Sequence, residues 1–305
     1  MHRTRVNFSF GSILLHKSKY WGIVNKHSNN NGWVDINGPI TIEKLKRLKK
    51  YEHIERLSSK QNTLLTAKIA QDFKLLRSVS QIWLWCDVTR AAIRYVVGIN
   101  NLKFLDVLCI KGVGKIDNFA DASTLERFLC AHAHYLTYED ISAISSCKSL
   151  KSFCLNTCRL ETKTIHKFLE LPNLETLELE DSNFDDKMAE SIAESRSIKN
   201  LEIGNTRLTK KGLFYICRMK QLEALDIWAT KVKENDLDIL VELPNLKYLS
   251  VGPSYEGNDF TPKMLIEKLG AIKSLKRIWI DGVKFNKSEK AILEDKYEQV
   301  RITYE

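Results

Sequence analysis

Residues 171–182 read Leu-Pro-Asn-Leu-Glu-Thr-Leu-Glu-Leu-Glu-Asp-Ser, and the spacing of their leucines decides the fold. The four leucines stand at positions i, i+3, i+6 and i+8 of a short frame. Only Ser59 and Ser195 are polar among the 40 positions of ten such frames, whereas a chain that is 44% apolar would by chance place about 18 apolar residues there. The frames recur at steps of 23–25 residues, with one step of 29, and begin at residues 51, 76, 99, 122, 147, 171, 195, 219, 243 and 272.

Each frame ends in a predicted strand that a helix follows. Apolar and polar residues alternate in Leu177-Glu178-Leu179-Glu180, and this period of two indicates a strand with one buried face. Apolar residues at helical spacing then predict helices over 185–195, 209–219 and 234–243. One such unit cannot enclose a core by itself. Neighbouring units must therefore stack, with their strands in one parallel sheet and their helices outside.

A polar position follows each strand. Residues 201–208, Leu-Glu-Ile-Gly-Asn-Thr-Arg-Leu, match the pattern LxLxxNxL with Thr in the place of Asn. On these features, over residues 46–303, the chain resembles leucine-rich-repeat proteins of the bacterial Thr-type and Cys-type, and more loosely leucine-rich-repeat inhibitors and immunity proteins. The resemblance implies an α/β solenoid whose curved parallel sheet is concave, whose helices are convex, and whose short polar side chains bond neighbouring backbones. That position holds Cys158, Ser182, Thr206, Thr230 and Ser254 in successive units.

The two ends depart from the repeat and are expected to be caps. Residues 1–45 contain apolar runs and the turn signals Asn31-Gly32 and Asn37-Gly38, which predict a β-rich N-terminal cap with a polar hairpin tip at 27–31. Residues 288–305 predict a helix and a final strand as a C-terminal cap. The solenoid between them spans 46–287 and includes a longer loop at 252–260. The apolar runs of the N-terminal cap lie at 8–10, 20–24 and 33–36.

The composition is that of a soluble globular protein. The 305 residues are 28% charged and include 5 Pro and 13 Gly, which excludes collagen-like and low-complexity classes. No apolar run approaches the roughly 18 residues of a spanning helix. The N-terminus lacks the small-residue cleavage site of a secretory signal. Together with an odd count of 7 Cys, these features predict a cytoplasmic location, reduced thiols and no membrane partner.

No motif for catalysis stands out, so we expect a non-enzyme that needs no cofactor. His132 and His134 follow Cys130, but Cys130 occupies a core position and no further metal ligand is in reach by spacing, so no metal site is expected. Gly112-Val-Gly114 lacks the rest of a phosphate loop and indicates a bend. Cys109 and Cys154 are expected on the concave face, with no neighbouring base to activate them.

The concave face is predicted to be acidic and aromatic. Positions that alternate with the buried ones carry four acids and no base between Thr176 and Trp228. Tryptophan and tyrosine anchor protein interfaces, and the long loop adds Tyr255 and Phe260 at the expected rim. The predicted partner-binding residues are Trp83, Trp85, Asp106, Glu178, Glu180, Glu202, Asp226, Trp228, Tyr248, Tyr255, Trp279 and Asp281.

Net charge and its distribution favour different partners. Lys and Arg number 47 against 38 Asp and Glu, a formal charge of +9, which by itself points to nucleic acid or an anionic surface. The bases, however, fall in the predicted helices and turns. An acidic concave face suits a basic protein, and the analogy with inhibitors suggests a bacterial immunity protein against a toxin such as a nuclease. The alternatives are nucleic-acid or anionic-surface binding by the convex face, or an adaptor subunit of an enzyme complex.

Overall fold

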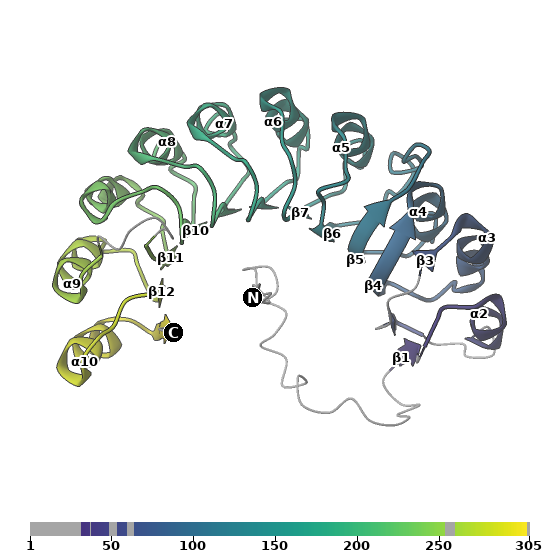
Figure 1. Cartoon of the computed structure of the whole chain (residues 1–305), viewed down its shortest axis with the longest axis horizontal. Helices are drawn as coiled ribbons and strands as arrows, with labels where there is room; N and C mark the ends of the chain where they lie inside the picture. Colours follow the sequence, from purple (N-terminus) through teal and green to yellow (C-terminus); the bar gives the residue numbers. More distant parts are fainter. Residues whose placement is uncertain (1–31, 37, 49–53, 60–63, 254–259, 304–305) are drawn as a thin grey trace.

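The computed structural model describes residues 32–36, 38–48, 54–59, 64–253 and 260–303. This part of the chain forms a horseshoe in which strands line the inner, concave side and helices the outer, convex side (Figure 1). Its strands form one 13-stranded sheet whose neighbours along the path follow chain order, and the pairs are parallel from end to end. The α/β solenoid predicted from the repeat is confirmed.

The strands are short in most repeats and long in two of them. β4 and β5 extend past their neighbours, and the two-residue β3 pairs with the far end of β4. The strands are β1 Trp33–Ile36, β2 Arg56–Ser59, β3 Leu64–Leu65, β4 Gln81–Thr89, β5 Phe104–Lys111, β6 Arg127–His132, β7 Ser152–Leu155, β8 Thr176–Glu178, β9 Asn200–Glu202, β10 Ala224–Asp226, β11 Tyr248–Val251, β12 Arg277–Asp281 and β13 Gln299–Thr303.

The convex helices begin at polar caps. Asp185, for example, accepts hydrogen bonds from the N–H groups of Lys187 and Met188 at 3.0 Å each. The helices are α2 Ile42–Leu48, α3 Ala67–Ala70, α4 Arg90–Val97, α5 Tyr138–Ile144, α6 Thr162–Leu169, α7 Asp186–Ile192, α8 Lys210–Ile216, α9 Pro262–Ala271 and α10 Lys287–Lys296, with 3₁₀ segments η1 Gln71–Leu75 and η2 Glu234–Glu242.

One predicted helix has a different geometry. Residues 234–242 wind as the 3₁₀ segment η2 and not as an α-helix. Asn235, Asp236 and Asp238 have low helix propensity because their side chains compete for backbone hydrogen bonds. Leu237 and Leu240 are still buried in the core. The apolar spacing therefore predicted the buried face correctly, but the prediction of an α-helix is wrong.

The core lies between the sheet and the helices. The frame residues Leu177 and Leu179 are fully buried. Phe128 and Phe153 of neighbouring repeats meet edge to face with ring centroids 5.9 Å apart, and Phe153 meets Phe168 of its own repeat edge to face with ring centroids 5.4 Å apart. Because each repeat packs only against its neighbours, the apolar frame forms one continuous core along the arc.

The expected side-chain ladder between repeats is wrong for the described positions that carry a hydroxyl. The hydroxyls of Ser182, Thr206 and Thr230 donate to the carbonyls of Leu179, Ile203 and Ile227 within their own repeats, at 2.6, 2.7 and 2.8 Å. A hydroxyl is shorter than an asparagine amide and reaches only the local turn. The backbone joins the repeats instead: the N–H groups of Thr157, Asp181, Asn205 and Ala229, all at positive φ, donate to carbonyls of the next repeat.

The ends continue the sheet where they are described. β1, the predicted strand at 33–36, pairs in parallel with β2, and β13 pairs in parallel with β12 after α10. The runs at 8–10 and 20–24 and the predicted hairpin tip at 27–31 lie outside the described residues. The division into caps and solenoid stays a prediction.

Candidate functional site

Two rows of side chains cross the concave face. Strand register, read through the paired residues, aligns Trp83, Asp106, Leu129, Cys154, Glu178, Glu202, Asp226, Ser250 and Trp279 as a first row. A second row, two residues earlier in each strand, aligns Phe104, Arg127, Ser152, Thr176, Asn200, Ala224, Tyr248 and Arg277. Neighbouring strands lie about 4.8 Å apart, so residues that are 24 apart in sequence become direct neighbours.

Three carboxylates sit side by side in the first row. We call Glu178, Glu202 and Asp226, on β8, β9 and β10, the acidic row. Their exposed fractions are only 0%, 1% and 4%. Asp226 accepts a hydrogen bond from the N–H of Trp228 at 3.0 Å. Carboxylates this buried and this close oppose one another's ionisation.

Burial and mutual repulsion shift the pKa values on this face. Burial raises the pKa of Asp226 to about 7, and a nearby Asp281 adds to that rise. Burial and the charge of Glu178 likewise raise the pKa of Asp106 to about 7. The pKa of Glu180 is raised by burial and by Asp226, Glu178 and Asp181, against a hydrogen bond from Trp228 that lowers it. The face therefore gains negative charge across neutral pH.

Apolar and aromatic groups flank the acidic row on both sides. Toward β4, Trp83 and Phe104 lie with ring centroids 4.7 Å apart, in one cluster with Leu129 and Cys154. Toward β13, Trp279 packs with Ala224 and Tyr248. An acidic centre between two apolar patches can hold a ligand that carries both positive charge and apolar side chains.

The tryptophans of the predicted site differ in how much of each side chain is exposed to solvent. Trp85 is 45% exposed, whereas Trp83, Trp228 and Trp279 are half-buried. Trp279 donates from Nε1 to Thr303 Oγ1 at 3.1 Å, and the Arg301 guanidinium lies 4.2 Å from its ring centroid. The final strand thus covers part of Trp279, which the sequence alone did not indicate.

The structure brings most of the predicted site residues to one face, although five of them are buried. Glu178, Glu180, Glu202, Asp226 and Tyr248 are buried; Asp106 and Asp281 are half-buried. Tyr255 lies outside the described residues. Phe260, expected at the rim, is buried in the core among apolar neighbours.

Gly204 was missed in the sequence. A Cβ at this position would lie 2.2 Å from Nε1 and 2.4 Å from Cδ1 of Trp228, so the indole can lie here only against a glycine. The one signal for it was a glycine directly after Ile203, the last buried position of the repeat frame, one residue past the end of β9.

The cysteines on this face are protected thiols. Cys109 and Cys154 are both buried, and burial raises the pKa of each, with nearby carboxylates adding to the rise. Among the described residues no group of three His, Cys, Asp or Glu side chains could hold a metal ion. Within the same residues no helix is long and apolar enough to cross a bilayer.

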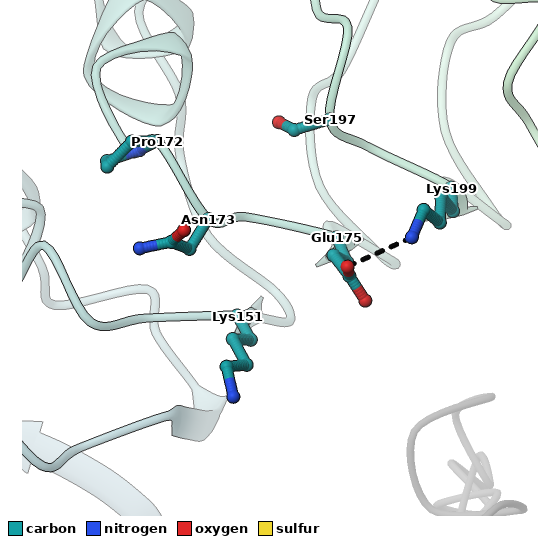
Figure 2. A pocket seen from close by; sticks show the side chains of 6 residues that line it. All are labelled: Lys151, Pro172, Asn173, Glu175, Ser197 and Lys199. Carbon is teal, nitrogen blue, oxygen red and sulfur yellow. Dashed lines mark hydrogen bonds and ion pairs between the residues drawn. The ribbon is translucent and has the colours of Figure 1, made fainter.

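The shallow pocket in Figure 2 lies at the edge where the strands begin. Its lining includes Lys151, Glu175 and Lys199, and Lys199 Nζ lies 3.0 Å from Glu175 Oε1. That ion pair belongs to a series between repeats along the same edge, with Lys151–Glu126 at 3.3 Å and Lys247–Glu223 at 2.7 Å. The pocket therefore lies among the ion pairs that join neighbouring repeats at this edge of the sheet, and it is separate from the acidic row.

The convex bases are partly neutralised by acids. Four of the lysines assigned to helices and turns form ion pairs: Lys163–Glu161, Lys167–Glu170, Lys210–Asp236 and Lys220–Glu242 at 3.0, 2.7, 3.5 and 3.3 Å. Pairing with acids weakens the positive field that phosphate binding requires.

Two solved structures place this horseshoe among known proteins. TLR13, in a complex with ssRNA13, matches with a TM-score of 0.50 and 16% identity over 88% of this chain and 46% of that one. A leucine-rich-repeat protein of Leptospira interrogans matches with a TM-score of 0.50 and 15% identity over 84% of this chain and 68% of that one. The chain has the leucine-rich-repeat fold.

The two matched structures share the fold of this chain at 16% and 15% sequence identity. The chain spans less than half of the TLR13 chain that it matches. No protein-family model matches the sequence, and no curated protein does.

Proposed function

We propose that this chain is a non-catalytic interaction module that binds a basic protein through its concave face. The observation that carries the proposal is the acidic row, Glu178, Glu202 and Asp226, held in register on adjacent strands. Opposite charge across an interface steers the encounter and selects the partner. Lys or Arg side chains entering this row would relieve the repulsion among its carboxylates.

The flanking aromatic groups support a folded or peptide-like partner. Trp83 and Phe104 on one side, and Tyr248 and Trp279 on the other, supply apolar area of the kind that dominates interface energetics. By analogy with leucine-rich-repeat inhibitors, we propose that the basic partner is a toxin such as a nuclease and that the chain is a bacterial, cytoplasmic immunity protein. This finer role rests on fold and charge pattern.

Nucleic-acid binding by the convex face has less support. Four of its lysines are paired with acids. The tryptophans Trp83 and Trp279, which could stack on nucleobases, lie on the concave face with the acids, although Phe214 of α8 is exposed on the convex side beside Arg218. The adaptor alternative has no recruiting motif in the sequence to favour it.

The test is capture from a native lysate on immobilised full chain, with bound proteins identified by mass spectrometry. Glu178→Lys combined with Glu202→Lys should abolish capture of a basic protein. Glu190→Lys combined with Glu194→Lys makes the same charge change at exposed positions in and just after α7 and should capture normally. Circular dichroism must show both variants folded. Unchanged capture by the concave variant, or a partner that is acidic, would refute the proposal.

A further inference from the structure

The first 31 residues carry a charge pattern that complements the concave face. They contain five bases and no Asp or Glu, the bases being Arg3, Arg5, Lys17, Lys19 and Lys26. They also hold Phe8, Phe10, Tyr20 and Trp21, aromatic residues of the kind that pack against apolar patches. The segment therefore has both properties that a ligand of the acidic row and its flanks needs.

The concave rows have no cation of their own around the acidic row. From β7 to β11 the two rows hold Ser152, Cys154, Thr176, Glu178, Asn200, Glu202, Ala224, Asp226, Tyr248 and Ser250, without Lys or Arg. Positive charge for this part of the face must come from outside the rows. The nearest row cations along the sheet are Arg127 on β6 and Arg277 on β12.

A buried hydroxyl on the same face also indicates a polar ligand. Ser152 is 4% exposed and lies in the second row beside Thr176, on the same side of β7 as Cys154. Its Oγ has no hydrogen-bond partner within the described part of the chain. Leaving a hydroxyl buried and unbonded is unfavourable, so this position favours a ligand that brings its own donors and acceptors, as a peptide backbone does.

The segment is long enough to reach the row. The described chain begins at residue 32, just before β1, and β9 is seven strand steps away along the sheet, which is about 34 Å at the usual strand spacing. Lys17 lies fifteen residues before residue 32, and fifteen extended residues span about 50 Å. Because the arc is curved, the straight path across the horseshoe is shorter still (Figure 1).

We propose that residues 1–31 of this same chain bind the acidic row as an intramolecular ligand, so that a basic partner has to displace them. The bases at 17 and 19 meet the carboxylates of the row, and the aromatic residues of the segment meet the flanking patches. Displacement of the segment by a basic partner rests on the proposed function of the concave face, but the binding of the segment to the acidic row does not. A segment of the same chain competes at an effective concentration of about millimolar, so a partner must bind the row more tightly than the segment does in order to displace it.

Hydrogen exchange of the full chain, followed by mass spectrometry, tests the contact without any partner. Amides within 1–31 should exchange at least tenfold more slowly than in a synthetic peptide of the same 31 residues. The protection should be lost in a variant with all five bases changed to Gln, in Glu178→Gln combined with Glu202→Gln, and in 0.5 M NaCl. The convex control, Glu190→Gln combined with Glu194→Gln, should keep it.

Three outcomes would overturn the inference. The segment could exchange as fast as the free peptide, its protection could survive the Glu178 and Glu202 variant, or its protection could rise with protein concentration, which would assign the contact to a second copy. Capture separates the two proposals. If the five-base variant frees the segment but captures no more basic protein than the parent, the contact stands and the proposed function fails.

Discussion

The indole of Trp228 lies against Gly204 of the preceding repeat, so that a Cβ at 204 would be 2.2 Å from Nε1. Trp228 follows Asp226 by two residues, and its N–H donates to Asp226 Oδ1 at 3.0 Å. The side chain of Trp228 thus packs on Gly204, while its backbone N–H donates a hydrogen bond to Asp226 of the acidic row. A change at Gly204 that moves Trp228 would therefore also disturb the hydrogen bond to Asp226 in the acidic row.

Gly204→Ala should displace Trp228 without changing any charge. We expect a loss of stability of no more than about 3 kcal/mol, typical of overpacking, together with weaker capture of a basic partner. Urea unfolding and capture measure the two effects. Gly270→Ala in α9 is the control, because its nearest neighbour is the flexible end of Lys296 at 3.3 Å and not a ring. If both variants behave alike, Trp228 does not rest on Gly204 in solution.

Asp226 should make stability depend on pH. Its pKa is raised from 3.8 to about 7 in the folded state, so between these values the folded protein holds a proton that the unfolded chain has lost. Stability from this group is therefore present below pH 4, falls as pH rises to 7 and is level above. Asp226→Asn should match the parent near pH 4.5 and exceed its unfolding free energy at pH 8 by at least about 1 kcal/mol.

The control for this pH effect is Asp238→Asn, which removes an aspartate charge from the exposed convex side. It should show no such gain at pH 8 in urea unfolding. An Asp226→Asn variant whose stability runs parallel to that of the parent from pH 4.5 to pH 8 would show that the carboxyl ionises normally.

Arg90 and Asp140 form a buried link between repeats. Arg90 Nε lies 3.0 Å from Asp140 Oδ2, and Asp140 also accepts the N–H of Thr137 at 3.0 Å to cap α5. Arg90→Met would leave a buried carboxylate without its cation and should cost about 3–5 kcal/mol. Arg94→Met, which removes the exposed Arg94–Asp117 pair at 3.7 Å, should cost less than about 1 kcal/mol. Chemical denaturation compares the two, and equal costs would contradict the assignment.

The seven cysteines should be unreactive in the native protein. All are buried and free, and burial raises the pKa of the Cys86 thiol to about 11 and that of Cys158 to about 12. Because the thiolate is the nucleophile, an aromatic disulfide reagent at pH 7.5 should find almost no thiol before denaturant is added and seven afterwards. Rapid reaction at Cys109 or Cys154 in the folded chain would show that the concave face opens.

The repeat could be predicted from the sequence because it depends on local periodicity. Leu177 in β8 and Leu179 directly after it are buried, as their alternation with polar residues indicated, and α7 and α8 lie within the predicted helical segments. Two features were not predictable in this way. The 3₁₀ geometry of η2 and the hydroxyl bonds of Ser182 and Thr206 depend on propensity and reach rather than on the period.

Local periodicity is enough to predict the parallel solenoid and the stretch of the concave face between Thr176 and Trp228 that holds acids and no base. How these residues meet depends on the stacking of the repeats. Strand register brings Glu178, Glu202 and Asp226 together although 24 residues separate each from the next. Burial then raises the pKa of Asp226, and the indole of Trp228 occupies the space left by Gly204. Periodicity is encoded within one repeat, whereas desolvation and contact arise only when repeats stack.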